Sequence, residues 1–286
     1  MPSLIDLRRR IRSVRNTQQV TKAMKMVSAA KLRRAQDRVL AARPYAAMYR
    51  ELRARVAAAV ATDERLATHP LLAQRPEERI VLVFFTADRG LAGAFNTNLI
   101  RAAQAFIAEQ AGKQVQLVTI GRKGRDFFRK RHFPIAAEYT GFSQKFDYAD
   151  AASVARFLIE RYARAETDAV YLLYNEFKSL ISARLTTVRV LPVQPAAAVR
   201  PVDYIFEQPP RELLEGLLPR YVEVAVYQAL LESVAAEHAA RMTAMDQATN
   251  NAAEMIARLT LYMNRVRQAS ITKEIIEVVS GAEALE

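Results

Sequence analysis

The 286-residue chain contains no cysteine. Disulfides, thiolate metal sites and a cysteine nucleophile are therefore excluded, and the composition fits a reducing compartment. The sequence also has no run of about 18 uncharged apolar residues, so we expect no membrane-spanning helix. Its opening residues, MPSLIDLRRR, carry charge where a signal peptide would carry an apolar run, and we expect no secretion signal.

Glycine and proline are absent from long stretches, and their absence divides the sequence into parts. No glycine occurs in residues 1–89, whereas six of the eight glycines fall between Gly90 and Gly141. Neither glycine nor proline occurs in residues 220–280. Because both residues interrupt helices, we predict an N-terminal helix over 1–61, an α/β domain over 77–194 and a C-terminal helix over 220–286. Five prolines in residues 195–219 indicate a linker.

Apolar residues repeat at helical spacing in both terminal segments. The first segment carries Leu4, Leu7, Ile11 and Val14, meets the polar Gln18 and Thr21, and resumes in a shifted phase with Val20, Met24, Val27, Leu32, Ala35, Val39 and Ala42. The last segment carries Met245, Ala248, Ala252, Met255, Leu259, Tyr262, Val266 and Ala269. As a helix, residues 220–280 would be about 90 Å long at about 1.5 Å per residue. A helix that long buries its apolar seam against another long helix. The two segments are therefore predicted to form an antiparallel coiled coil with both termini at one end.

The residues between these helices alternate strand and helix patterns. Strands are predicted at 79–87, 115–120, around Ile135, at 169–177 and at 183–193, with helices at 92–110, 125–131 and 153–163. Strands separated by helices favour a mostly parallel, Rossmann-like sheet, and the final pair favours an antiparallel edge. The predicted fold class is α/β, with the long two-helix coiled coil added to the central domain.

Positive charge is concentrated in the first segment. The formal net charge is +12, and residues 1–60 carry 15 Lys and Arg against 3 Asp and Glu, so the rest of the chain is balanced. Nucleic acid is one partner for such a helix, through Arg8, Arg9, Arg10, Arg12 and Arg15. Residues 1–40 have no aromatic side chain for base stacking. This favours an acidic protein surface, contacted by Lys22, Lys25, Arg33 and Arg34.

The sequence offers no catalytic, metal or cofactor site. The turn in DRGLAGAFN (88–96) has neither the three glycines of a dinucleotide fingerprint nor the Gly-Lys-Ser/Thr of a phosphate loop, so we expect it to serve strand-to-helix geometry. The three histidines, His69, His132 and His238, are far apart in sequence and have no carboxylate at ligand spacing. We predict that the chain is not itself an enzyme.

The end of the last helix changes character within NRVRQASITKEIIEVVSGAEAL (264–285). Arg265, Arg267 and Gln268 supply hydrogen-bonding groups, and the residues that follow are apolar on most sides. A helix of that kind is usually enclosed. If both termini lie at one end, this tip extends past its coiled-coil partner and must be enclosed by other chains.

At these residues the sequence resembles the gamma subunit of the F-type (rotary) ATP synthase, essentially from end to end. The resemblance is carried by SVRNTQQVTKAMKMVSAAKLRRAQ (13–36), DRGLAGAFN (88–96), AARMTAMDQATNNA (239–252) and the 264–285 segment. It implies the central rotor shaft of a proton-translocating complex, present in one copy, with three alpha and three beta subunits, an epsilon subunit and a c-subunit ring as partners. It further implies catalytic nucleotide sites on those partners, no cofactor here, and a peripheral location on the cytoplasmic face of the bacterial plasma membrane.

The resemblance also implies roles for individual residues. An acidic surface of beta would meet Lys22, Met24, Lys25 and Arg33; a catch loop of beta would meet Arg241, Arg267, Gln268 and Thr272; an apolar bearing would hold Ile276, Val279 and Leu285; and the c ring would meet Tyr204, Phe206 and Glu207. Two alternatives stay open from the residues alone. One is a basic coiled-coil protein that binds nucleic acid, and the other is a nucleotide-binding enzyme built on the middle domain.

Overall fold

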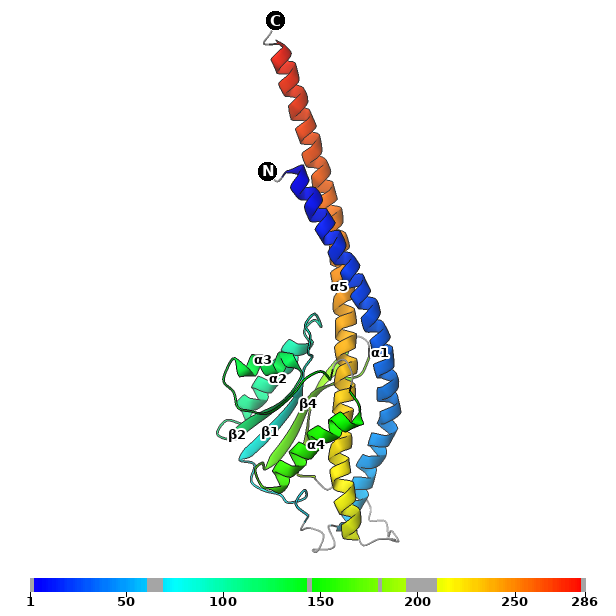
Figure 1. The fold of residues 1–286 in the computed structure, drawn as a ribbon, viewed down its shortest axis with the longest axis vertical. Helices are drawn as coiled ribbons and strands as arrows, with labels where there is room; N and C mark the ends of the chain where they lie inside the picture. Colours follow the sequence, from blue (N-terminus) through cyan, green and yellow to red (C-terminus); the bar gives the residue numbers. More distant parts are fainter. Residues whose placement is uncertain (1–2, 61–68, 143–145, 180–181, 194–209, 284–286) are drawn as a thin grey trace. The chain divides into compact units, whose positions relative to one another are not determined.

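The computed structural model describes residues 3–60, 69–142, 146–179, 182–193 and 210–283 (Figure 1). The chain divides into two compact units, one formed by residues 1–29 with 241–286 and the other by residues 30–240. Two long helices, α1 (Leu4–Val60) and α5 (Pro210–Glu283), contribute residues to both units, and the sheet lies in the second.

The helix starts follow from local chemistry. Ser3 caps α1, because its Oγ accepts a hydrogen bond from the Asp6 backbone N–H at 3.1 Å and donates to the Asp6 carboxylate at 2.8 Å. Helix α5 begins at Pro210, so the predicted linker over 195–219 and helix start at residue 220 are wrong for residues 210–219. Proline is well suited to the first helical position, where its missing N–H has no intrahelical acceptor. The rest of the predicted linker lies outside the described residues.

The sheet of the second unit has five strands in the order β3-β2-β1-β4-β5. The strands are β1 (Arg79–Phe85), β2 (Gln114–Ile120), β3 (Ile135–Tyr139), β4 (Ala169–Phe177) and β5 (Ala183–Leu191), connected in part by α2 (Phe95–Glu109), α3 (Arg122–Arg129) and α4 (Tyr148–Ala163). Strands β1 to β4 pair in parallel and β5 pairs antiparallel to β4. The predicted mostly parallel sheet with an antiparallel edge is confirmed.

Strand β1 is buried on both faces, which explains its uninterrupted apolar sequence RIVLVFF. Its Leu82 and Phe84 join Leu99 and Phe106 of α2 in the hydrophobic core. Ala236 of α5 belongs to the same core cluster, so α5 packs directly on the α/β domain. Its segment from Tyr221 to Ala240 is buried or half-buried throughout.

In the first unit, α1 and α5 run antiparallel, with Thr21 paired to Thr249 and Lys25 to Asp246. The predicted phase shift in α1 is wrong. Thr21 is buried (8 % exposed) and stays in the seam, whereas Val20 and Val27 are more than half exposed. The seam tolerates the two threonines because they pair with each other: the Thr249 hydroxyl donates a hydrogen bond to Thr21 Oγ1 at 2.8 Å.

The predicted seam of α5 also needs correction. Met255 and Tyr262 are 51 % and 42 % exposed, while their neighbours Ile256 and Met263 are half-buried. The predicted and the observed seam both keep the 3-4 spacing and share Ala252, Leu259 and Val266. They differ in which of two neighbouring residues completes the repeat. The pattern of one helix cannot decide that, because the choice depends on the partner helix.

Candidate partner-contacting surfaces

The end of α5 is an apolar surface that no other described residue covers. Extrapolating the pairing of Thr21 with Thr249 places Leu4, the first residue of α1, beside Val266, and α5 continues beyond it (Figure 1). Every residue from 271 to 280 is exposed. The large apolar side chains among them, 48–73 % exposed, are Ile271, Ile275, Ile276, Val278 and Val279. Exposed apolar surface of this extent marks an interaction site.

Three polar residues of the predicted catch, Arg267, Gln268 and Thr272, lie just beyond the point on α5 that faces the start of α1. Arg267 and Gln268 are exposed, and neither side chain has a hydrogen-bond or ion-pair partner among the described residues. The Thr272 hydroxyl donates to the Gln268 carbonyl at 3.0 Å, which is a bond within the helix. Residues four apart share a helix face, so Gln268, Thr272 and Ile276 lie in one row. This row joins hydrogen-bonding groups directly to the apolar end.

Arg241 does not belong to that row. It lies 26 residues before Arg267 on the same helix, which corresponds to about 39 Å along the axis at 1.5 Å per residue. Arg241 is also half-buried. The structure therefore separates Arg241 from the other three predicted catch residues, and one partner loop could not contact both places.

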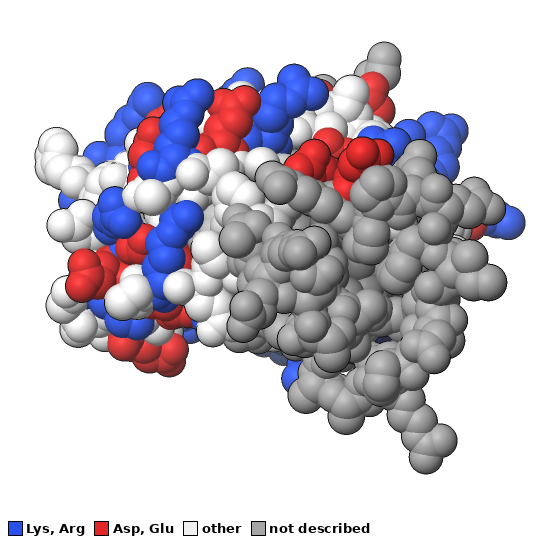
Figure 2. Space-filling model, turned by 90° about the horizontal axis from the view of Figure 1, so that it is seen from below, with Lys and Arg blue, Asp and Glu red and all other residues white. Residues whose placement is uncertain are grey.

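The predicted basic contact residues differ in their environments. Lys22 is exposed in the first unit and Arg33 is exposed in the second. Met24 and Lys25 are half-buried, and Lys25 Nζ forms an ion pair with Asp246 Oδ1 at 2.5 Å. Part of the charge that the sequence assigned to a partner is thus compensated within the molecule. Beyond the first segment charges are mixed, and the described surface seen from below carries interleaved basic and acidic side chains (Figure 2).

The glycine-containing turn after β1 is held by its own polar side chains. Asp88 accepts hydrogen bonds from the backbone N–H of Arg122 at 3.2 Å and of Gly141 at 3.0 Å. Asn96 accepts from the Ala87 N–H at 2.9 Å. The Asp88 contacts join the turn to the segments that follow β2 and β3, and the Asn96 contact closes the turn itself, so both side chains help to build the fold.

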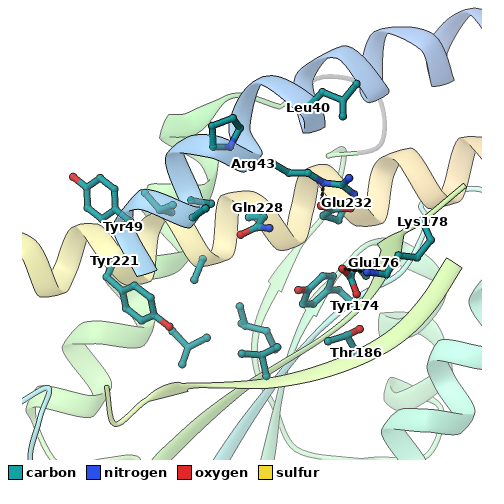
Figure 3. Close-up of a pocket in the computed structure, with 18 residues that line it drawn as sticks. Leu40, Arg43, Tyr49, Tyr174, Glu176, Lys178, Thr186, Tyr221, Gln228 and Glu232 are labelled. Carbon is teal, nitrogen blue, oxygen red and sulfur yellow. Dashed lines mark hydrogen bonds and ion pairs between the residues drawn. The ribbon is translucent and has the colours of Figure 1, made fainter. Parts of the chain in front are cut away.

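A cavity of about 760 Å³ lies in the second unit between α1, α5 and the β4–β5 hairpin (Figure 3). At its edge Arg43 of α1 forms an ion pair with Glu232 of α5, Nε to Oε1 at 3.0 Å. Hydrogen bonding to Glu232 raises the pKa of Arg43 above its ordinary value, so the guanidinium stays charged at physiological pH. Sequence reasoning missed this pair. The signal was a lone acid in the apolar run YQALLESVAA.

The described residues contain no cluster of His, Asp or Glu that could hold a metal ion. Among the described helices, none is long and apolar enough to cross a membrane. The predicted contact residues Leu285, Tyr204, Phe206 and Glu207 lie outside the described residues.

The chain is similar over its whole length to proteins of one family. The family described as ATP synthase matches residues 3–285 of the chain. The ATP synthase gamma chain of Solibacter usitatus is 65 % identical over 286 residues, and that of Anaeromyxobacter dehalogenans strain 2CP-C is 53 % identical over 290, each covering 100 % of both chains. The chain belongs to the ATP synthase gamma chain family.

Solved structures agree with this assignment. A chain in the central stalk and c-ring structure of the Tetrahymena thermophila mitochondrial ATP synthase is 26 % identical, with a TM-score of 0.59, covering 80 % of this chain and 99 % of that one. A chain of the Euglena gracilis mitochondrial ATP synthase has a TM-score of 0.67 at 18 % identity, covering 99 % and 94 %. The second likeness shows the fold alone.

Proposed function

We propose that this chain is the central rotor shaft of a proton-translocating F-type ATP synthase, and that it has no catalytic site of its own. The proposal rests chiefly on the similarity of the whole chain to gamma chains such as that of Solibacter usitatus, which is 65 % identical over 286 residues. The bare apolar end of α5 supports it independently, because that end has the properties of a surface held by other chains.

The shaft would work by presenting different side chains to partner subunits as it turns. Three alpha and three beta subunits would surround one copy of this chain, and an epsilon subunit and the c ring would attach to it. Each beta subunit would change conformation as the shaft's surface moves past it. A shaft of paired helices suits this task, because each helix satisfies its own backbone hydrogen bonds and its seam is packed.

The apolar end would turn in a sleeve of alpha and beta side chains. Ile276 and Val279, both more than half exposed, offer no hydrogen bond to hold one angle over another. Dispersion and hydrophobic contacts are non-directional, so the end can stay enclosed at every angle of rotation. Leu285 would extend this bearing.

Angle-dependent contacts would come from the polar and basic residues. Arg267, Gln268 and Thr272 would hydrogen-bond one loop of beta, and Arg241 would meet a different part of the stator. Lys22 and Arg33 would attract an acidic surface of beta, with Met24 beside them, while Lys25 contributes less because Asp246 partly compensates it. Tyr204, Phe206 and Glu207 would contact the c ring.

In the cell, the chain would sit on the cytoplasmic face of the bacterial plasma membrane and touch the membrane only through the c ring. The test is native affinity purification of the chain from its own cells. We expect one copy with three copies each of two larger ATP-binding chains, and ATP-driven proton pumping by the complex in vesicles. Recovery of the chain with nucleic acid, or without those larger chains, would contradict the proposal.

A further inference from the structure

Arg43 and Glu232 form a bidentate ion pair, and both side chains also hydrogen-bond the backbone at the end of β4. The Glu232 carboxylate accepts from Arg43 Nε and from one terminal guanidinium nitrogen of Arg43, each at 3.0 Å. The same carboxylate accepts from the Phe177 N–H at 3.0 Å, and Arg43 donates to the Phe177 carbonyl at 2.6 Å. Three elements, α1, α5 and β4, therefore meet in one hydrogen-bond network. Figure 3 shows the Arg43–Glu232 part of it.

The environment of this network makes it strong. The Glu232 side chain is only 2 % exposed, whereas that of Arg43 is 39 % exposed. A carboxylate so deeply buried is stable only when it is paired and hydrogen-bonded, and here three donors satisfy it. Charge-assisted bonds with fork geometry are stronger than neutral ones and fix direction as well as distance. The contact therefore resists both sliding and rotation of α1 against α5.

Beside Arg43, α1 buries Val39 and Ala46, but neither belongs to the core cluster of the α/β domain. Ala236 of α5 belongs to the core cluster of the α/β domain, and among the described residues no member of that cluster comes from α1. Leu40 of α1 and Val188 of β5 border the 760 Å³ cavity, so they do not fill the space between helix and sheet. The network beside the cavity directly connects α1 to the end of β4. A second contact of α1 with the α/β domain is that of Arg38 with the Phe146 carbonyl, which precedes α4, at 3.4 Å.

We infer that Arg43 and Glu232 are positioning residues that fix α1 to α5 and to the end of β4, so that the helices and the α/β domain of residues 30–240 turn as one body. The inference rests on the proposed rotor function. A loose connection would convert part of the applied torque into relative motion of helix and sheet, and proton movement would then be less tightly coupled to ATP turnover. A fixed one passes the torque on.

The test compares three single substitutions in the assembled complex. Glu232→Gln keeps the shape of the side chain and removes its charge, and Arg43→Lys keeps the charge and removes the fork. Lys178→Gln is the matched control, because Lys178 lies on the same cavity and pairs with Glu176 at 2.6 Å, but in an exposed position. Surface pairs of that kind contribute little to rigidity.

Two measurements are made on each variant. Spin labels on cysteines introduced at the exposed Ala41 and Thr187 report the distance between α1 and β5 by pulsed EPR, and no native cysteine of this chain interferes. Reconstituted vesicles report protons pumped per ATP hydrolysed. We expect Glu232→Gln to broaden the distance distribution and to lower the pumping ratio, because the substitution breaks a buried ion pair. Arg43→Lys should fall between it and the control, which should match the wild type.

The outcomes are separable. Unchanged distance widths and pumping ratios in Glu232→Gln would overturn the inference, and so would a variant that only reduces the yield of complex while the surviving complexes couple normally. If Glu232→Gln does not assemble, Arg43→Lys carries the same test. Failure of the wild-type chain itself to assemble or pump would instead refute the rotor function, and the distance distributions could still be measured on the full chain.

Discussion

Gly121 gives the sharpest prediction about stability, because two separate penalties oppose any larger residue there. Its φ of 96° and ψ of 147° lie in a region that only glycine occupies readily, which would cost alanine about 1–3 kcal/mol. A Cβ atom would also collide with the Thr86 backbone carbonyl, and overpacking of this kind costs about 1–3 kcal/mol. We expect Gly121→Ala to lower the free energy of unfolding by about 2–6 kcal/mol.

Three other glycines separate the two penalties. Gly112 has a φ of 91°, and no atom lies within 4 Å of the position that an alanine Cβ would take, so its alanine variant carries backbone strain alone. In α3, Gly124→Ala would meet the Phe84 ring and would lie 2.9 Å from Thr86 Oγ1, so it carries overpacking, offset by about 1 kcal/mol of better helix propensity. At Gly90 the nearest atom is 3.8 Å away, and alanine there should be neutral or slightly stabilising.

The assay is urea unfolding of the full chain, followed by tyrosine fluorescence because the chain has 11 tyrosines and no tryptophan. The expected order of destabilisation places Gly121→Ala first, Gly112→Ala and Gly124→Ala in the middle, and Gly90→Ala last. If Gly121→Ala were no less stable than Gly112→Ala, the close approach of the loop after β2 to Thr86 would be refuted.

Three further predictions concern the seam, the sheet and the tip. Thr21→Val should lower the free energy of unfolding by about 1 kcal/mol. The Thr21→Val/Thr249→Val double variant should lose less than the sum of the two single variants, because both hydrogen-bonding groups are then removed, and strict additivity in urea unfolding would argue against the bond. Hydrogen bonding to Arg79 lowers the pKa of Asp168, so Asp168 stabilises the fold above its unfolded pKa of about 3.9 and loses this effect as the pH falls. Asp168→Asn should thus cost about 1–3 kcal/mol at pH 7 and progressively less in acid, and a pH-independent difference would contradict the assignment. Ile276→Asp should change the free energy of unfolding of the chain by less than about 0.5 kcal/mol relative to the wild type, because the side chain is exposed. It should weaken co-purification of the alpha and beta chains, since an unpaired carboxylate would enter an apolar sleeve. Undiminished assembly would exclude that sleeve.

The sequence predicted the sheet well because its signals are local. An uninterrupted apolar run such as residues 79–85 is typical of a buried parallel strand, and the glycines mark the turns. The start of α5 was placed too late because five prolines outweighed the helical pattern around Leu218, which is buried in the structure. Tertiary packing stabilises a helix through Pro219 that local propensity alone would not favour.

The surfaces were predictable in kind and less so in detail. The bare apolar end followed from the unequal reach of two paired helices, and Ile276 and Val279 are indeed exposed. The ion pair of Lys25 with Asp246 could not be foreseen, because it joins residues 221 positions apart. The same holds for Arg43 and Glu232, whose partnership depends on the register of the helices.

The exposed end of α5 has a consequence for how the chain enters its complex. Residues 271–280 bury no side chain in this molecule, so only intrahelical bonds and the helix before them oppose fraying. Amide hydrogens there should exchange with deuterium sooner than those of residues 221–240, although one helix contains both. Insertion into partner chains would then complete the folding of the last turns. The entropy lost in that ordering would lower the affinity of the partner chains for this end of the rotor, which suits a surface that must rotate against them.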